Sequence, residues 1–403
     1  MSPAWASLPP SWRHPDARCL GTSALFHAFG MAGEQVVLGW LALELTDSVL
    51  MVGVALGLRM LPMLLFGVPA GVVADRVDRV WLLEVTGAAT GAATATLGLL
   101  ALSGRLGIGP LLLLAFVGGS ARALHQTARQ GFAHDVSGAG RLVQTIVLVG
   151  LSSRLGGLAG ALAIGAFIAR YGAGVAYLAV AAGYLACAAA MLPARTRARA
   201  PVVDGSVVAG VVGFVSMVRR DRTLLSLMAL TAAAEMFGFS HQALLPSLAR
   251  DVLHVGPAGL GVLTGARQAG GLIGIGLVSG LGVARGHGPV FLAVLIGFGA
   301  AVLVLGVAPS FAVVVLILIA VNAMGATCDV LSQTLIQLAV PAGQRGRAGG
   351  AWVVAIGMAP LGQFQIGALA SLLGVGAALG ANGLALIAVA GAAALLVPRL
   401  RRL

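Results

Sequence analysis

The chain has 403 residues, of which 59% are hydrophobic and only 9% are charged. Apolar runs recur along its whole length, which excludes a soluble globule with one buried core and predicts a polytopic membrane protein. The net charge of +12 comes entirely from arginine, because the chain contains no lysine. These arginines gather in short segments between apolar runs, which excludes a nucleic-acid-binding face.

The apolar runs predict transmembrane helices, because a hydrocarbon core of about 30 Å needs roughly 20 helical residues per crossing. Alternating strands of about ten residues, which would indicate a membrane barrel, are missing from the sequence. Breaks at proline, glycine and charge clusters predict twelve spans, at residues 19–45, 49–73, 80–102, 107–129, 142–169, 173–193, 223–248, 257–282, 289–308, 311–339, 349–373 and 376–397.

The spans fall into two groups of six, separated by one long connection. We predict an N-terminal segment at residues 1–18 and a six-helix bundle at 19–193. A linker at 194–222 follows, with an apolar stretch at 207–218 that has the composition of a surface helix. A second bundle at 223–397 and a basic tail at 398–403 complete the chain.

Arginine placement predicts the orientation. If both termini are cytoplasmic, the inside segments hold 18 arginines and the outside loops only three, Arg105, Arg170 and Arg250. This asymmetry follows the positive-inside rule. The polar start has no cleavable signal pattern, so we expect the first span to act as an uncleaved anchor.

The two halves repeat in sequence. Gly53 and Arg59 recur as Gly261 and Arg267, both offset by 208 positions. The pair Gln126-Thr127 recurs as Gln333-Thr334 at an offset of 207, and that register places Arg122 opposite Asp329. Several matches at nearly one offset predict a duplicated, pseudo-symmetric fold.

The segment Gly71-Val-Val-Ala-Asp75-Arg76-Val-Asp78-Arg79, predicted as a loop between the second and third spans, resembles the loop signature of the major facilitator superfamily. The resemblance covers nearly the whole chain and looks closest to the bacterial exporter branch that includes the enterobactin exporter and drug:proton antiporters. Three further passages carry it: Leu45-Thr46-Asp47-Ser48 leading into Val52-Gly53, Arg154-Leu155-Gly156, and Gly346-Arg347-Ala-Gly-Gly-Ala-Trp352.

The resemblance implies an all-α fold of 12 transmembrane helices in two pseudo-symmetric bundles, working as a monomer by alternating access in a bacterial inner membrane. It also implies roles for the loop: Gly71 would allow close helix approach, Asp75 would cap and pair near the eleventh helix, and Arg76 and Arg79 would hold the inward gate. The sequence departs from the pattern at Asp78, where many members have glycine, and at Val80, where a second basic residue is usual.

The antiporter signature of the fifth span is degraded. Gly156, Gly160 and Gly165 match its glycine positions, whereas Ala161 replaces the proline and Ile164 another glycine. This leaves the direction of transport open. Tight helix packing is the default reading of these glycines, because small residues let helix backbones approach in a membrane.

Seven charged residues within the predicted spans qualify as intramembrane charges. A charge at the bilayer centre costs a few kcal/mol or more, so such residues usually face an aqueous cavity or a partner. Those on helices that line the cavity by resemblance are the candidates for substrate or proton sites: Glu34, Arg122, Glu235 and Asp329. His27 and Asn322 join them, because each lies seven positions before Glu34 or Asp329 on the same helical face.

The remaining three charges are secondary candidates with mainly structural roles: Arg59, Arg154 and Arg267. Glu34 and Asp329 rank highest for proton or cation binding, and Glu235, near Phe237 and Phe239, suits a cationic or amphipathic ligand. We also consider a gate between Arg122 and Asp329, which the repeat places in equivalent positions.

No cofactor is expected. Cys19, Cys187 and Cys328 are too scattered for a metal site or a disulfide, and no His, Cys or Asp cluster has metal-ligand spacing. His125 and His241 are expected to be structural. A phosphate-binding Gly-x-x-x-x-Gly-Lys loop is missing, so any coupling would come from an ion gradient, with protons suspected.

The expected partners are the lipid bilayer, a small-molecule substrate and protons. The leading interpretation is proton-coupled efflux of hydrophobic or amphipathic compounds, drug-like or siderophore-like. A proton-coupled importer or facilitator of a small metabolite remains open, as does a receptor or scaffold that keeps the fold without transport. No constellation of nucleophile, base or metal indicates an enzyme.

Overall fold

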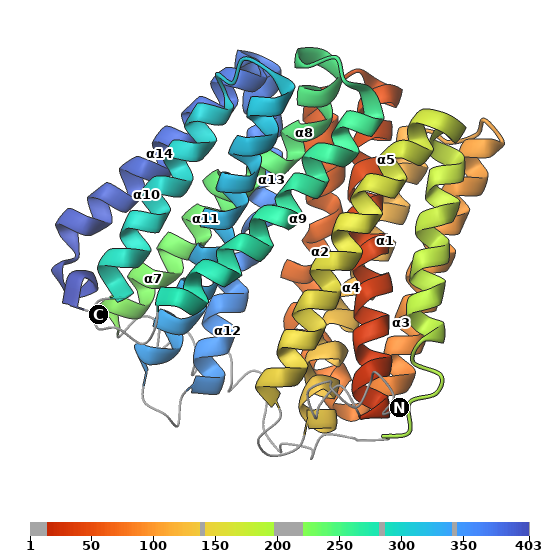
Figure 1. Ribbon diagram of the computed structural model, residues 1–403, viewed down its shortest axis with the longest axis horizontal. Coiled ribbons are helices and arrows are strands. Elements are labelled where there is room, and N and C mark those ends of the chain that lie inside the picture. Colours follow the sequence, from red (N-terminus) through yellow and green to blue (C-terminus); the bar gives the residue numbers. More distant parts are fainter. Residues whose placement is uncertain (1–13, 138–141, 197–220, 282–286, 341–344, 403) are drawn as a thin grey trace, which may run out of the picture. The chain divides into compact units, whose positions relative to one another are not determined.

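The computed structural model of the chain describes residues 14–137, 142–196, 221–281, 287–340 and 345–402, nearly all of them in helices (Figure 1). The expected surface helix at 207–218 and most of the expected linker at 194–222 lie outside the described residues. So do most of the expected N-terminal segment and the last residue of the expected tail.

Helix is present at each of the twelve predicted spans, which confirms the all-α membrane fold. Eight spans are single helices: α1 (Pro15–Thr46), α2 (Val49–Arg76), α3 (Arg79–Leu102), α4 (Ile108–Ser137), α9 (Gly256–Leu281), α10 (His287–Leu305), α11 (Phe311–Leu338) and α14 (Val375–Leu396). The eleventh span consists of α12 (Arg345–Ile356) and α13 (Ala359–Leu373), and the tail forms the short helix η7 (Pro398–Arg402).

Among the described residues, nine helices are long and apolar enough to cross a membrane by length and composition. The nine leave out α1 and α9, although these have 32 and 26 residues. Each carries a charged residue followed by glutamine, Glu34-Gln35 in α1 and Arg267-Gln268 in α9, which lowers its hydropathy.

The fifth and sixth spans make up α5 (Leu142–Ala189), which turns back on itself at Gly172. Gly172 has φ 81° and ψ 168°, a conformation that glycine adopts without strain. A Cβ on Gly160 would clash with the Phe29 carbonyl oxygen, and one on Gly183 would lie 2.8 Å from the Phe29 ring. Because residues on both sides of Gly172 reach Phe29, the two limbs of α5 lie side by side against α1.

The seventh span departs from the regular helix predicted at residues 223–248. It comprises α7 (Arg222–Ala233), the π-helix η3 (Ala234–Gly238), the 3₁₀-helix η4 (Phe239–Leu244), α8 (Leu245–Ser247) and the π-helix η5 (Leu248–Val252). Pro246 has no N–H group to continue an α-helical ladder, which favours a change of winding nearby. Glu235 lies in the first π turn, a feature often found at functional sites.

The predicted repeat is visible in the backbone. Asp47 with φ 49° and His254 with φ 53° are the described non-glycine residues in left-handed conformation, and they lie 207 positions apart. Both stand in the turn after the first span of a half. Gly172 with φ 81° and Gly374 with φ 85° form a second such pair, in the turn before each half's last span. The same turns recur in the two halves, as a duplicated fold requires.

The chain divides into two compact units, each a bundle of helices. Unit 1 comprises residues 1–46, 58–202 and 256–265, and unit 2 comprises 47–57, 203–255 and 266–403. The two short exchanged segments are held by glycine contacts. In unit 2 a Cβ on Gly53 would lie 2.5 Å from the Gln363 carbonyl oxygen, and in unit 1 a Cβ on Gly261 would lie 2.7 Å from the Ala161 carbonyl oxygen.

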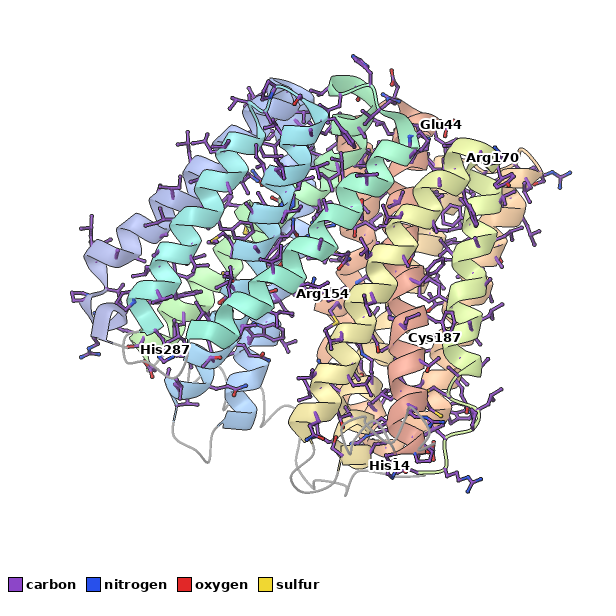
Figure 2. The ribbon with its side chains drawn as sticks, in the orientation of Figure 1. His14, Glu44, Arg154, Arg170, Cys187 and His287 are labelled. Atoms are coloured by element: carbon purple, nitrogen blue, oxygen red, sulfur yellow. The ribbon has the colours of Figure 1, made fainter. Side chains whose placement is uncertain are left out.

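One end of unit 1 holds an apolar cluster to which every helix of the bundle contributes. Its fully buried members include Leu20 of α1, Leu83 of α3, Phe132 of α4 and Met191 after α5. The beginnings of α1 and α3 therefore meet the end of α4 and of the sixth span, as in an up-and-down bundle. Figure 2 labels His14 at this end and Glu44 and Arg170 at the other.

The segment Gly71 to Arg79 was expected to be a loop, and this is largely wrong. α2 continues through Arg76. The change of direction is confined to Val77 and Asp78. Asp78 begins α3 by accepting a hydrogen bond from the Trp81 N–H at 2.9 Å, so this departure from the family pattern acts as a helix cap.

Candidate functional site

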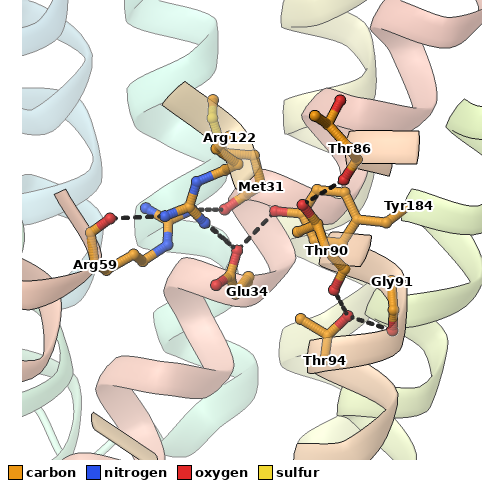
Figure 3. Close-up of polar contacts among 9 residues, drawn as sticks. All are labelled: Met31, Glu34, Arg59, Thr86, Thr90, Gly91, Thr94, Arg122 and Tyr184. Carbon is orange, nitrogen blue, oxygen red and sulfur yellow. Dashed lines mark hydrogen bonds and ion pairs between the residues drawn. The ribbon is translucent and has the colours of Figure 1, made fainter. Parts of the chain in front are cut away.

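The described part of unit 1 contains a buried charge cluster made of Glu34, Arg59, Arg122 and Tyr184, which we call the Glu34 cluster (Figure 3). Oxygen Oε2 of Glu34 accepts hydrogen bonds from Arg122 Nη1 at 2.5 Å, from the Tyr184 hydroxyl at 2.6 Å and from Arg59 Nη2 at 3.4 Å. Its members come from α1, α2, α4 and the second limb of α5. The cluster therefore ties four helices together.

Both arginines also bond backbone oxygen. Arg59 Nη2 donates to the Met31 carbonyl at 2.9 Å, and Arg122 Nη2 donates to the Arg59 carbonyl at 2.8 Å. The second bond needs close approach of α2 and α4, which Gly119 provides, because a Cβ there would clash with the Arg59 carbonyl oxygen. The expected structural contact of Arg59 with a carbonyl is present, but Arg59 belongs to the charged site as well.

Burial makes this arrangement energetically demanding. The side chains of Glu34, Arg59 and Arg122 are 3%, 8% and 11% exposed. A lone charge in such surroundings would be costly, so two cations and a hydroxyl around one carboxylate favour a Glu34 that keeps its negative charge. The cluster carries one excess positive charge, and an anion near it would be attracted.

His27 and Glu34 both contact Tyr184, from its two sides. This agrees with the prediction that His27 and Glu34 share one face of their helix. The His27 ring meets Tyr184 edge-on at 5.6 Å between centroids and stacks on His125 at 4.1 Å. His27 is 4% exposed and His125 1%. A ladder of threonines on α3 flanks the site, and Thr86 hydrogen-bonds to His125 Nδ1 at 3.0 Å.

The predicted gating residues behave differently from one another. Arg79 is buried and its Nη1 donates to both carboxylate oxygens of Asp135, at 2.6 Å each. Arg76 is exposed, and the side chain of Asp75 lies outside the described residues. No described atom lies within 4 Å of a Cβ built on Gly71, and the close helix approach expected there stays a prediction.

The same end of unit 1 is closed by Asp16. Its carboxylate accepts hydrogen bonds from the backbone N–H of Arg195 at 3.1 Å and of Thr196 at 2.9 Å, and from the Thr196 hydroxyl. Burial alone would raise the pKa of Asp16, but these hydrogen bonds outweigh it and leave the pKa below its usual value. The first span is thus joined to the residues that follow the sixth.

Unit 2 places its two acidic candidates in one neighbourhood. Glu235 and Asp329 are both partly exposed, and their carboxylates interact electrostatically. The charge of Arg267 acts on the buried His241, whose Nδ1 hydrogen-bonds to the Gly238 carbonyl at 2.7 Å. Unit 2 therefore groups three of the predicted charges, two of them acidic.

Other candidates have structural roles in the described residues. Asn322 is buried, and its amide donates to the Leu318 carbonyl of its own helix at 2.9 Å. A Cβ on Gly156 would clash with the Leu25 carbonyl oxygen, and Gly160 makes the similar contact with Phe29 already described. These glycines pack α5 against α1, as their default reading predicted. Arg154, on the same limb of α5, is partly exposed (Figure 2).

Comparison with known proteins identifies the family. The model of the transmembrane secretion effectors, part of the major facilitator superfamily, matches residues 5–403. The chain belongs to this family. No curated protein matches the chain.

Solved structures agree with the fold of this superfamily member. A POT peptide transporter in complex with alafosfalin is 14% identical, with 96% of this chain and 95% of that chain covered and a TM-score of 0.79. The nucleoside transporter NupG is 12% identical over 94% and 99% of the chains, with a TM-score of 0.78. A bacterial homolog of the human lysosomal transporter Spinster is 15% identical over 98% and 97%, at 0.69.

These comparisons establish a transporter of the major facilitator type rather than an enzyme. The narrower assignment to the enterobactin-exporter branch stays a prediction.

Sequence reasoning missed two residues of this transporter that complete charged contacts. Tyr184 has no charge and Asp135 lies past the predicted end of the fourth span, so neither attracted notice. A signal for Asp135 was available, since an acid near a helix end suits a basic partner at the same membrane surface. The gate between Arg122 and Asp329 stays a prediction.

Proposed function

We propose that this transporter exports hydrophobic or amphipathic small molecules in exchange for protons, by alternating access of its two halves. The family description, a secretion effector, supports outward movement. Ionisable side chains inside both bundles support ion coupling, because charges at such depth are costly unless they serve a path or a partner. We place the transporter as a monomer in a bacterial inner membrane, and the arginine asymmetry supports cytoplasmic termini.

The observation that carries the coupling proposal is the contrast between the acids of the two units. Glu34 is 2% exposed and held by two arginines and a tyrosine, whereas Glu235 and Asp329 are partly exposed and face each other's charge. Two carboxylates that share a site repel, so binding one proton or one cationic substrate relieves the repulsion. A proton and a cationic substrate would then compete for the same pair of carboxylates, and such competition is what exchange requires.

We therefore assign the exchange role to Glu235 and Asp329 and a positioning role to Glu34. Phe237 and Phe239, on either side of Gly238 near Glu235, offer aromatic surface to a lipophilic cation. Arg79 and Asp135 serve as part of the gate at the end of unit 1 that we place in the cytoplasm.

The test is transport in proteoliposomes with an imposed pH gradient and a trapped pH dye. The probes are a lipophilic cation, a neutral amphipathic drug and a catecholate siderophore, added one at a time. Exchange predicts that substrate and protons move in opposite directions and that flux disappears when the gradient is collapsed. Parallel movement of substrate and protons would indicate an importer, and no flux of any probe would favour the receptor interpretation.

Variants locate the coupling. Glu235→Gln and Asp329→Asn are expected to abolish proton-driven flux while substrate counterflow, which needs no net proton movement, persists. Glu44→Gln is the matched control, because Glu44 is an exposed acid at the end of α1 and belongs to neither group of charges. Proton-driven flux that survives in both unit 2 variants would refute the assignment.

A further inference from the structure

We infer that His27, His125 and Cys187 form a buried binding site for a soft metal ion, with copper(I) as the preferred ion. The three residues come from α1, α4 and the second limb of α5, separated by 98 and 62 positions in the chain. Their ligand atoms all lie within 4.8 Å of one another. The expectation from sequence spacing, that no metal cluster exists, is revised because the cluster forms only by tertiary packing.

The geometry suits a metal with three ligands. Metal–nitrogen and metal–sulfur bonds of about 2.0 and 2.3 Å, spread at 120°, place the nitrogen and sulfur about 3.7 Å apart. His125 Nε2 and Cys187 Sγ are 3.9 Å apart. That separation is long for a hydrogen bond and close to what a trigonal site needs. The His27 ring stacks nearly parallel to the His125 ring, at 4.1 Å between centroids, so it must turn out of this stack to aim a nitrogen lone pair at the same ion.

Hydrogen bonds around the site set the ligands in the required form. The Thr86 hydroxyl donates to the Leu82 carbonyl at 2.6 Å, so its oxygen accepts from His125 Nδ1–H at 3.0 Å. His125 then has its lone pair on Nε2, the atom near Cys187. Cys187 is positioned in turn by the Ser23 hydroxyl, 3.2 Å from its sulfur.

A second observation points to a ligand. His27 is 4% exposed, and its Nδ1 is buried with no hydrogen-bond partner in the described structure. An unsatisfied buried ring nitrogen is costly, and a metal bond would satisfy it. Cys187 and His125 are 0% and 1% exposed, so the ion would be enclosed by protein.

Charge selects the ion. The positive charge of Arg129 acts on Cys187 and on both histidines, and those of Arg59 and Arg122 reach His27. Glu34, across Tyr184 from His27, is already bound by its two arginines. Copper(I) held by one thiolate and two neutral imidazoles adds no net charge, whereas zinc(II) would add one positive charge beside these arginines. Thiolate also favours copper(I) as a soft ion.

Binding is a substitution without oxidation or reduction. The Cys187 thiol loses its proton to solvent as the sulfur–metal bond forms, and copper is supplied as copper(I). Because the site has no exposed ligand, we assign it as a resident site that fastens α1, α4 and α5 together, and not as the transport path. It is independent of the efflux proposed above.

The experiment uses the full-length protein in detergent, stripped of metal and loaded anaerobically with copper(I) against a chromophoric copper(I) chelator. We expect one copper per chain and an X-ray absorption spectrum with one sulfur and two nitrogen neighbours. The double variant Cys19→Ser/Cys328→Ser, which keeps only Cys187, must give the same spectrum. This spectroscopic measurement does not depend on substituting a residue of the proposed site.

Substitutions then test the ligands. Cys187→Ser should weaken copper(I) binding at least 100-fold, and Thr86→Val, which removes one hydrogen-bond partner of His125 Nδ1, about 10-fold. His241→Asn, which replaces a buried histidine of unit 2, should leave copper(I) binding unchanged. Failure of the protein to compete with the chelator, or a spectrum without sulfur, would overturn the proposal. Stoichiometric zinc(II) binding without copper(I) binding would overturn the choice of ion.

Discussion

Replacing Glu34 with glutamine tests whether the Glu34 cluster is held by a permanent carboxylate. The change keeps the shape of the side chain and removes its charge, leaving Arg59 and Arg122 buried with no acid between them. With an effective dielectric constant of about 20, contacts of 2.5 and 3.4 Å correspond to about 7 and 5 kcal/mol of Coulomb attraction. Desolvation of the ions opposes most of this.

Loss of one partner from a buried ion pair generally costs about 3–5 kcal/mol, and we expect Glu34→Gln to fall in that range. Arg122→Gln should cost less, about 2–3 kcal/mol, because Arg59 and Tyr184 still hold Glu34. The double variant should cost less than the two losses together by about 1–3 kcal/mol, since removing Arg122 also removes a cation that loss of the carboxylate would have left unpaired.

The measurement is the free energy of unfolding in mixed micelles, followed by tryptophan fluorescence across a denaturant series. Glu44→Gln, at the exposed end of the same helix, should stay within about 0.5 kcal/mol of the parent. A neutral or stabilising effect of Glu34→Gln would refute the reasoning. It would mean that Glu34 is already neutral in the fold and that the arginines find their partners elsewhere.

Three further outcomes follow from the structure. Gly160→Ala should destabilise the fold by about 1–3 kcal/mol, because the added methyl group clashes with the Phe29 carbonyl oxygen. Gly150→Ala, with open space around it, should be neutral or stabilise by up to about 1 kcal/mol. Thermal unfolding distinguishes the two variants, and equal losses of stability would contradict the packing. The pKa of Asp16 is lowered in the fold, so the contribution of Asp16 to folding stability is full above about pH 5 and disappears as pH falls through the folded pKa. The difference in unfolding free energy between the parent and Asp16→Asn should therefore shrink below about pH 4. Arg79→Asp should lower stability by about 1–3 kcal/mol and adding Asp135→Arg should restore part of it, unless the ion pair contributes nothing.

Helix positions could be predicted from sequence because they depend on local properties. The length and polarity of each apolar run set a crossing, and the reversal at Gly172 needs only a residue that tolerates positive φ. The repeat was readable for the same reason, since equivalent turns such as Asp47 and His254 keep equivalent spacing. Where winding depended on more than local composition, in the π turns around Glu235, the sequence predicted a regular helix and was wrong.

The sequence by itself determined that this is an all-α membrane protein with costly charges inside its helices. Only the tertiary structure decided which groups meet: Arg122 reaches Glu34 across 88 positions, and Tyr184 reaches it across 150. The physical reason is that periodicity reveals neighbours three or four residues apart on one helix, whereas packing joins helices at any separation along the chain. His125 and Cys187 became candidate metal ligands for the same reason, because nothing in their spacing relates them.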